Sequence, residues 1–544
     1  MGCQPYFSPI VVARLLTQSF CRASLFLPPT LPAMTQPDCI LGIDIGTTST
    51  KVVLFSASGA SLDQHTVGYP LLSAQPDVQE QDPEAIYQAV IESVRTVMQR
   101  HPARLKTLMG LSFSAAMHSL IAVDDRGQLL TCSITWADRR STPWVSQIRQ
   151  CCDAHALYAR TGTPVHPMSP LVKLMWLRHE RPDLFRQAAK FISIKEYVIH
   201  RWFAQYVVDY SIANATGLFN MKALDWDAEA LALAGITSAQ LSQLVPTTHI
   251  LSSMTSEAAD SMGLPASVPV VIGASDGALG NLGVGAMTPD VVAITVGTSG
   301  AVRAMVDRPQ TDPKERLFCY ALTENHWVIG GATNNGGIIL RWVREQLAMA
   351  ETDTARLLQE NPYDILTAIA ATIPAGSEGL IFHPYLAGER SPLWNANARG
   401  SFFGLGLHHT KAHMIRAVLE GVVYNLYIVL TALEDVVGPA SSIQATGGFA
   451  RSTLWRQMLA DVFNRVVTIP EVYESSCFGA AVLGLYALER IPHLEQVSEM
   501  IGESDRHCPI PENAQQYQVM LPLYMQLLES FKPFYEAIAK IQST

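Results

Sequence analysis

The sequence predicts an α/β fold made of two duplicated domains that face each other across a cleft. Strand-like apolar runs alternate with helix-like stretches along the chain, which is typical of α/β architecture. In addition, residues 40–59 form an apolar run, a turn of glycine and hydroxyl residues, and a second apolar run, and residues 291–306 repeat this plan. Two hairpins of one design in separate halves of the chain indicate a duplication, with a ligand held between the two tips.

Length and composition narrow the class of protein. The 544 residues exceed the size of one hydrophobic core, so two large domains are expected. A net charge of −10 argues against a nucleic-acid partner, which requires a basic face. No uninterrupted apolar run reaches the length of about 20 residues that spans a bilayer, so no membrane partner is expected. Nine scattered Cys without a C-x-x-C pair indicate reduced thiols and a cytoplasmic location.

The first residues differ in character from the rest. Residues 1–33 contain Arg but no Asp or Glu, as a transit peptide would, and Met34 stands just before the first apolar run. We favour the alternative that translation begins at Met34. We therefore exclude a leader, 1–38, from the fold and expect domains at 39–288 and 289–544.

The turn of the first hairpin, Gly46-Thr47-Thr48-Ser49-Thr50-Lys51, carries more hydroxyl groups than a tight turn needs. Backbone N–H groups and hydroxyls at such a tip can form an anion-binding concavity, and no P-loop motif is present to bind phosphate instead. Lys51 adds a positive charge here or is a solvated strand lysine. Asp44 ends the preceding apolar run, and a buried carboxylate that is not paired indicates a nearby Mg²⁺.

The second half of the chain offers a matching set of groups. Gly297-Thr298-Ser299 repeats the first turn. Asp276 follows a strand in 266–287, within what we predict to be a Gly-rich turn, and is placed to act as a general base toward a substrate hydroxyl. Residues 441–464 predict a strand, a Gly447-Gly448 turn and a helix, a layout that lets the backbone approach a ligand.

Two further segments suit a polyol. Met117-His118 follows a strand predicted at 105–115, although a lone His is more often structural. Trp136, Asp138 and Arg139 place aromatic and polar groups in one loop. Flanking these segments, we expect a helix at 82–100 with Asp82 as its N-cap, and a C-terminal packing helix at 517–541 that a proline interrupts.

Together these motifs resemble the FGGY carbohydrate kinases, which belong to the actin-like ATPase superfamily with ribonuclease-H-like domains. The resemblance covers residues 39–490. It rests on seven ordered motifs: DIGTTSTK, MHS, HPMSPLVKLMWL, GASDGALGNLG, TVGTSG, GSFFGLGLHHTKAHMIRAVLEGV and TGGFARS.

The resemblance implies two ribonuclease-H-like domains that close a catalytic cleft on ATP, Mg²⁺ and a sugar. It implies that both hairpin tips contact phosphates, that Gly447-Gly448 meets the adenosine, and that Asp44 lies near the metal. It also implies that Asp276 is the catalytic base and that Met117-His118 touches the substrate.

Within the family, Met117-His118-Ser119 and residues 193–220 look like the gluconate kinases, whereas xylulose kinases usually have Met-His-Gly. A substrate carboxylate requires a cation or several donors in its pocket. The sequence does not rank the candidates, each of which is alternatively a salt-bridge residue: Arg139, His166, Lys195 and Arg390.

Three functions stay open at this point. The first is transfer of phosphate from ATP to D-gluconate, which gives 6-phosphogluconate. The second is the same chemistry on xylulose or another pentulose. The third is a non-catalytic nucleotide switch of the actin type, which would not need an acid such as Asp276 beside a sugar pocket. A homodimer is possible, and the sequence does not decide the oligomeric state.

Overall fold

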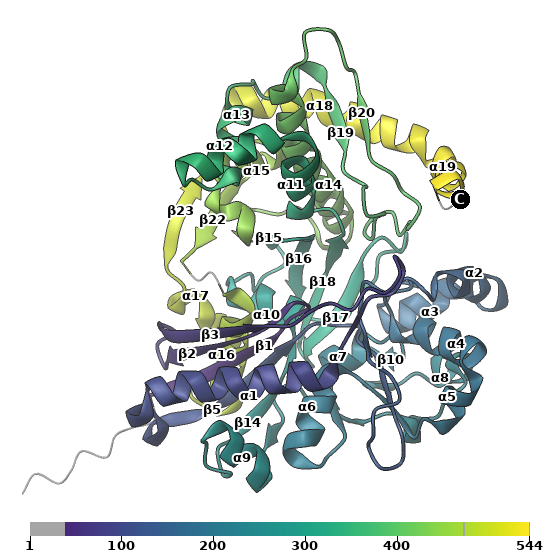
Figure 1. The fold of residues 1–544 in the computed structure, drawn as a ribbon, viewed down its shortest axis with the longest axis vertical. Helices are drawn as coiled ribbons and strands as arrows, with labels where there is room; N and C mark the ends of the chain where they lie inside the picture. The colour runs from purple at the N-terminus through teal and green to yellow at the C-terminus, as the bar shows by residue number, and fades with distance from the viewer. Residues whose placement is uncertain (1–37, 472–473, 543–544) are drawn as a thin grey trace, which may run out of the picture. The chain divides into compact units, whose positions relative to one another are not determined.

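The computed structural model describes residues 38–471 and 474–542. The predicted leader, 1–38, therefore lies outside the described residues except for Asp38. The described residues form one compact unit, built around two large sheets that lie in the lower and upper parts of Figure 1.

The N-terminal sheet has six strands in the order β13-β14-β5-β1-β2-β3. Strands β1, β2 and β3 are antiparallel neighbours, β5 and β14 run parallel to β1, and β13 is an antiparallel edge. The strands are β1 (Cys39–Ile45), β2 (Ser49–Ser56), β3 (Ser61–Gly68), β5 (Leu108–Ala115), β13 (Ile250–Leu251) and β14 (Val270–Ser275).

The C-terminal sheet repeats this arrangement, which confirms the predicted duplication. Its order is β17-β18-β16-β15-β21-β22-β23, with β15, β16 and β18 antiparallel, β21 and β22 parallel to β15, and β23 as an antiparallel edge. The strands are β15 (Val291–Val296), β16 (Gly300–Val306), β17 (Phe318–Thr323), β18 (His326–Thr333), β21 (Ser442–Thr446), β22 (Val466–Pro470) and β23 (Glu503–His507).

Equivalent helices cover the two sheets. Helix α1 (Pro83–Arg100) packs on β2 and β3, and its predicted N-cap is confirmed because the Asp82 carboxylate accepts the Glu84 N–H. Helix α14 (Lys411–Val437) packs on β16 and β18 of the other sheet. Further helices include α2 (Thr142–Cys151), α3 (Ala154–Thr161), α4 (Pro170–Glu180), α6 (Ile194–Phe203), α7 (Tyr210–Asn214), α9 (Ser256–Met262), α11 (Gly337–Trp342), α12 (Met349–Leu358) and α13 (Pro362–Ala371).

Helix α14 is long and mostly apolar. By length and composition alone this helix could cross a membrane, with a mean hydropathy of 1.4, but 78% of its most apolar window is buried inside the protein. Arg416 and Glu420 interrupt its apolar run, as the sequence shows. These two side chains are buried and form an ion pair of 2.8 Å, which compensates their charges within the core.

The predicted Gly-rich turn within 266–287 is wrong in one respect, since Asp276–Gly283 form helix α10. Ser275 caps this helix by accepting the Ala278 N–H, which compensates for the poor helix propensity of the glycines. Helix α10 packs against α16 (Ser475–Ala487), the helix that follows the equivalent strand of the other sheet. Glycine allows this approach, because a Cβ on Gly479 would lie 2.0 Å from the Leu279 carbonyl oxygen.

The remaining predicted elements are present with shifted boundaries. Strand β21 is followed by a 3₁₀ turn and by α15 (Thr453–Phe463), as the Gly-Gly pattern predicts. The C-terminal helix begins earlier than predicted, as α18 (Pro511–Phe531), and a 3₁₀ turn at Lys532–Phe534 separates it from α19 (Tyr535–Gln542).

Replacing Gly479 by Ala is expected to lower the free energy of unfolding by about 1–3 kcal/mol or more, because α10 and α16 would have to separate. Gly280→Ala is the matched control in the same helix pair, since the nearest atom to its Cβ would be Ser476 Oγ at 3.5 Å. The control is expected to stay within about 1 kcal/mol of the parent protein. Urea unfolding measures both, and equal stability of the two variants would contradict the account of this contact.

Candidate active site

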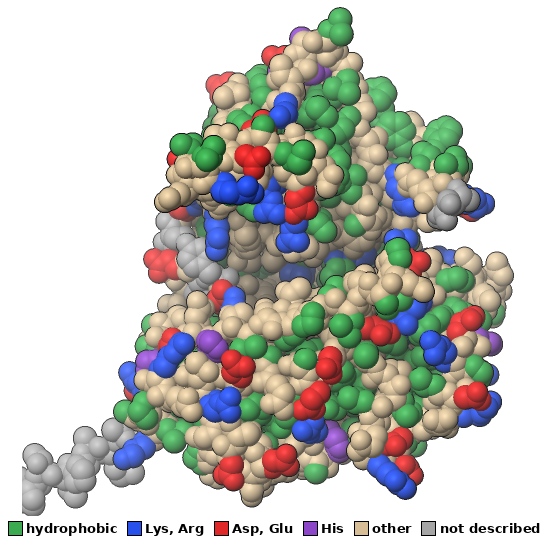
Figure 2. Space-filling view, in the orientation of Figure 1, with side chains coloured by type: hydrophobic (Ala, Val, Ile, Leu, Met, Phe, Trp, Pro, Cys, Tyr) green, Lys and Arg blue, Asp and Glu red, His purple; other side chains and the backbone are tan. Residues whose placement is uncertain are grey.

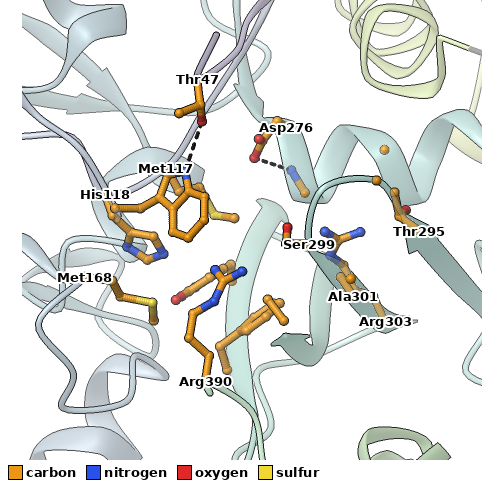
Figure 3. A pocket seen from close by; sticks show the side chains of 18 of the residues that line it. Thr47, Met117, His118, Met168, Asp276, Thr295, Ser299, Ala301, Arg303 and Arg390 are labelled. Atoms are coloured by element: carbon orange, nitrogen blue, oxygen red, sulfur yellow. Dashed lines mark hydrogen bonds between the residues drawn. The ribbon is translucent and has the colours of Figure 1, made fainter. Parts of the chain in front are cut away.

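One pocket collects groups from both sheets (Figure 3). Figure 2 shows the surface hollowed between the two sheet-containing parts, with basic side chains visible in the depth. Both hairpin tips, Asp276 and the Met117-His118 turn line this pocket. Its other polar and aromatic lining residues are Trp136, Thr295, Arg303, Phe318, Tyr320, Arg390, Trp394, Ser475 and Ser476.

The tip of the first hairpin is fixed by hydrogen bonds to the backbone and to Thr47. The Thr47 hydroxyl accepts the Trp136 indole N–H at 3.0 Å, and the Thr47 carbonyl accepts the Gln81 amide at 2.5 Å. Gly46 N–H donates to the Ser49 carbonyl at 3.0 Å, and Thr48 is exposed at the tip. Thr47 is the residue of this tip that lines the main pocket, whereas Gly46, Thr48 and Ser49 are at least partly exposed beside it.

Two residues of the predicted phosphate turn have other partners. Thr50 is fully buried, with its hydroxyl 3.4 Å from the Tyr69 hydroxyl, so the structure does not bring Thr50 to the pocket. Lys51 forms an ion pair of 2.5 Å with Glu474, which stands before α16. Sequence alone could not reveal this pair, because the two residues are far apart along the chain.

Asp44 ends β1 beside the pocket. Its carboxylate accepts a hydrogen bond of 2.6 Å from the Ser114 hydroxyl. Burial, reinforced by the negative charge of Asp276, raises the pKa of Asp44 to about 6. Two nearby carboxylates disfavour each other's negative charge, and a divalent cation bound beside them would relieve this repulsion.

Asp276 occupies the first position of α10, at the point where β14 delivers the chain to the pocket. Its carboxylate accepts the Gly277 N–H at 2.7 Å. Burial raises the pKa of Asp276, and the positive charge of Arg303 opposes that rise. An acid with a raised pKa that lines a cleft is suited to accept a proton from a substrate hydroxyl.

The second hairpin tip joins two adjoining pockets. Gly337 N–H donates to the Gly297 carbonyl at 2.7 Å, and Ile338 N–H donates to the Thr298 carbonyl at 3.1 Å, so the start of α11 supports the tip. Ser299 lines the main pocket, whereas Thr298 lines the adjoining one. This adjoining pocket includes Gly448, and its other lining side chains include Arg341, Asn361, Tyr363, Asp364, Phe449 and Trp455.

Gly447 brings the strand β21 close to β15. Its φ of +111° lies in the region that favours glycine, and a Cβ would lie 2.4 Å from the Val296 carbonyl oxygen. The predicted Gly-Gly turn therefore lies beside the second hairpin tip.

His118 and Met117 lie on the N-terminal side of the main pocket. His118 has a φ of +68°, an uncommon backbone conformation for a residue other than glycine. Its Nδ1 lies 2.7 Å from the Ala215 carbonyl oxygen, which can only accept, so Nδ1 carries the proton. Burial lowers the pKa of His118 to about 3, which leaves Nε2 of a neutral ring as an acceptor.

Two of the predicted substrate residues have structural partners instead. Ser119 Oγ accepts the Ile194 N–H at 3.0 Å, at the start of α6. Asp138 is buried, accepts the Gln79 N–H at 3.0 Å and forms an ion pair with Arg140, although it also lines a pocket that adjoins Trp136. The structure does not bring Ser119 or Asp138 into the main pocket.

The structure separates the four candidate cations for a substrate carboxylate. Lys195 forms a fully buried ion pair of 2.5 Å with Asp209, so its charge is already compensated. Arg139 lies at a half-exposed position 3.8 Å from Asp77. His166 is neutral, because burial lowers its pKa to about 3.

Arg390 is the candidate that lines the main pocket. Its guanidinium donates to the Thr333 carbonyl at 3.0 Å and lies over the Trp136 indole, 4.6 Å from the centre of the ring. Burial lowers the pKa of Arg390 to about 10, which still leaves it charged at neutral pH.

Sequence reasoning missed Arg303. This residue lies on β16, three positions after the Gly300 that closes the second turn, and it lines the same pocket as Asp276 and Arg390 (Figure 3). The signal was present, since Arg303 is the one charged residue within an otherwise apolar predicted strand.

The duplicated sheets, with two hairpin tips and an acid between them, define the class of protein: an enzyme with the actin-like ATPase and sugar kinase fold. The N-terminal domain of the FGGY family of carbohydrate kinases matches residues 39–283, and the C-terminal domain of that family matches residues 292–488. The chain belongs to the FGGY family of carbohydrate kinases and is a phosphotransferase.

Individual relatives are similar over nearly the whole chain. A gluconokinase of Bacillus subtilis is 53% identical over 92% of this chain and 98% of its own length, and a xylulose kinase of the same species is 27% identical. A solved gluconate kinase from Lactobacillus acidophilus has a TM-score of 0.86 at 38% identity, covering 92% of this chain and 99% of its own. A ligand-bound xylulose kinase from the same organism has a TM-score of 0.86 at 37% identity, with the same coverage.

Removing the charge of Lys195 is expected to destabilise the fold rather than to change substrate affinity. Lys195→Met leaves Asp209 buried without its counter-ion, so the free energy of unfolding should fall by about 3–5 kcal/mol. The double variant Lys195→Met/Asp209→Asn is expected to recover most of this loss, because no buried charge remains. Urea unfolding tests both variants. A weaker affinity for substrate at unchanged stability would assign Lys195 to the site instead.

Proposed function

We propose that this protein transfers phosphate from ATP to D-gluconate and forms 6-phosphogluconate. Two relatives named gluconokinase, from Bacillus subtilis and Bacillus licheniformis, are each 53% identical to this chain over 504 residues. The proposal includes a small-molecule substrate and a cytoplasmic location. It also includes the two domains 39–288 and 289–544, whose boundary falls between α10 and β15.

The observation that carries the proposal is the position of Asp276. It lines one pocket together with both hairpin tips and two arginines, Arg303 and Arg390. The tips offer backbone and hydroxyl groups for phosphates, whereas the arginines offer charge for an acidic substrate. A pocket of this composition inside a protein of net charge −10 suits a sugar acid better than a neutral sugar.

Asp276 would accept the proton of the C6 hydroxyl as that oxygen attacks the γ-phosphorus of ATP. A bond forms between O6 and the γ-phosphorus, the bond from the γ-phosphorus to the β,γ-bridging oxygen breaks, and ADP leaves. Backbone and hydroxyl groups of the two tips would stabilise the charge on the transferred group. These groups are Gly46, Thr47, Thr48 and Ser49 of the first tip, and Gly297, Thr298 and Ser299 of the second.

The residues at the end of β1 fit a magnesium ion. Among residues 38–471 and 474–542, no cluster of three or more His, Cys, Asp or Glu side chains could hold a metal ion alone. Mg²⁺ commonly takes one or two carboxylates and completes its ligands with phosphates and water. Asp44 lies close enough to Asp276 that the charge of Asp276 helps to raise the pKa of Asp44. Asp44 would hold the ion, and the bound ion would neutralise negative charge on the phosphates.

The pocket beside Gly447 and Gly448 would hold the nucleoside of ATP. It adjoins the second tip through Gly297 and Thr298, so a nucleoside there would direct its phosphates toward Asp276. Aromatic side chains of Tyr363, Phe449 and Trp455 line it.

A pentulose such as xylulose is the second candidate substrate. It is favoured by the solved xylulose kinase with 37% identity and a TM-score of 0.86. The neutral sugar would leave the two pocket arginines without an anionic partner, which is why we prefer gluconate. The third candidate function is a non-catalytic nucleotide switch. Asp276 disfavours it, because a switch would not need an acid in this pocket.

Substrate choice is tested by following ADP release with ATP and Mg²⁺ on D-gluconate, D-xylulose, L-ribulose and glycerol. We expect a clear preference for D-gluconate, because it alone in this set carries a carboxylate for the pocket arginines. A preference for D-xylulose would leave the kinase mechanism in place and overturn the assigned substrate.

Asp276→Asn is expected to lower kcat by about 10³-fold or more, since it removes the general base while keeping the shape of the side chain. Binding of ATP, measured by calorimetry, should be nearly unchanged, because the nucleotide pocket is formed by other residues. Asp138→Asn is a control from a neighbouring loop outside the main pocket. A fully active Asp276→Asn variant would overturn the proposed chemistry.

A further inference from the structure

Arg303 is a half-buried cation that forms no hydrogen bond or ion pair with its guanidinium among residues 38–471 and 474–542, although the negative charge of Asp276 lies near enough to attract it. Its Nε is buried and has no hydrogen-bond partner within these residues. Arg390 of the same pocket also has a buried Nε without a hydrogen-bond partner there, whereas Arg416 and Lys195 elsewhere in the fold are paired with Glu420 and Asp209. Buried guanidinium N–H groups without partners are costly, so the two arginines of this pocket indicate an anionic ligand.

The position of Arg303 directs it into the substrate pocket. Side chains of a strand alternate between the two faces, and both Ala301 and Arg303 of β16 line the pocket. The Arg303 side chain lies next to the start of α10, since a Cβ on Gly277 would be 3.4 Å from Arg303 Nε. Figure 3 shows its guanidinium on the same side of the pocket as Ser299 and facing the region between Asp276 and Arg390.

Two arginines, Arg303 and Arg390, and one carboxylate, that of Asp276, act on one another in this pocket, so a further anion can be bound there. Asp276 attracts Arg303, whereas Arg390 and Arg303 repel each other across the pocket. Arg390 is partly anchored by the Thr333 carbonyl and the Trp136 ring, whereas within the described part of the chain no hydrogen bond or aromatic ring anchors the Arg303 guanidinium. Since Asp276 must stay available to accept a proton, a substrate anion is the group that would compensate the two arginines.

We propose that Arg303, supported by Arg390, binds the carboxylate of the substrate and selects a sugar acid over a neutral sugar alcohol of the same length. This inference rests on the proposed function and adds the residue that sets its substrate class. In an open-chain sugar acid the carboxylate and the terminal hydroxyl are at opposite ends. The hydroxyl lies at Asp276, and the chain extends along the pocket so that its other end meets the arginines.

The experiment compares D-gluconate with D-glucitol, which has the same hydroxyl chain but carries a CH₂OH group in place of the carboxylate. For the parent protein we expect a kcat/KM at least about 100-fold higher for D-gluconate. Arg303→Met is expected to lower kcat/KM for D-gluconate by about 100-fold, mainly through KM, and to change the value for D-glucitol less than about threefold. Where turnover of D-glucitol is too slow, its inhibition constant against D-gluconate supplies the same comparison.

Two controls keep the result specific. Arg303→Lys retains the charge and is expected to recover part of the affinity for D-gluconate. Thermal unfolding of Arg303→Met without ligand is expected at about the same temperature as the parent, because the substitution removes no hydrogen bond or ion pair of the guanidinium within the described residues. An unfolded Arg303→Met variant would overturn the description of Arg303 as unpartnered.

The outcomes separate this inference from the proposed function. Equal losses on both substrates would mean that Arg303 acts on Asp276 or on the phosphates, and an unchanged preference would mean that it does not contact the carboxylate; either result overturns the inference alone. A parent protein that prefers neutral sugars overturns both. A parent protein that prefers another sugar acid, with that preference lost in Arg303→Met, overturns the choice of gluconate and supports the role of Arg303.

Discussion

The close contact between helices α10 and α16 is the constraint on which the site depends. Each helix follows the second parallel strand of its own sheet, β14 or β22, and the two pack together through glycine positions. Helix α16 also packs against β1 and β5, so this contact connects the second half of the chain to the first sheet. Because Asp276 is the first residue of α10, the same contact that joins the halves places the acid between the hairpin tips.

A second constraint is electrostatic. The pocket holds Asp276 and two arginines, with Asp44 nearby, in surroundings that raise the pKa of both acids through burial. Under the proposed function, this arrangement would be compensated when phosphates, a cation and an anionic substrate bind together. A ligand that lacks one of these charges would then leave a polar group of the pocket unsatisfied, which would favour the proposed substrate.

Much of this architecture could be predicted from the sequence, because local patterns determine it. Both hairpins have β-branched flanks around glycine and hydroxyl turns, and Asp82 caps α1 as expected. Helix α10 was not predicted, since three glycines in eight residues favour a turn and only the packing against α16 overrides that preference. Patterns also do not tell which way a polar side chain faces. The sequence makes Thr50, Ser119 and Lys195 candidates for the site, but in the structure each of them is bonded to a partner elsewhere in the fold.

Arg303 illustrates the opposite error. A charged residue in a predicted strand is usually taken as solvated, and only the three-dimensional arrangement shows it beside Asp276 and Arg390. The partner of a buried charge depends on segments that are distant along the chain, and in this case the expected partner is a ligand. Sequence reasoning therefore recovers most elements and the position of Asp276 in the pocket, whereas the choice of substrate depends on long-range contacts.

The most direct test of the account is a crystal structure of the protein with D-gluconate and a non-hydrolysable ATP analogue. The account predicts the C6 hydroxyl within hydrogen-bond distance of Asp276, the terminal phosphate between the two hairpin tips, and the carboxylate at Arg303 and Arg390. A sugar acid bound in the reverse direction, with its carboxylate toward the tips, or bound outside this pocket would contradict it.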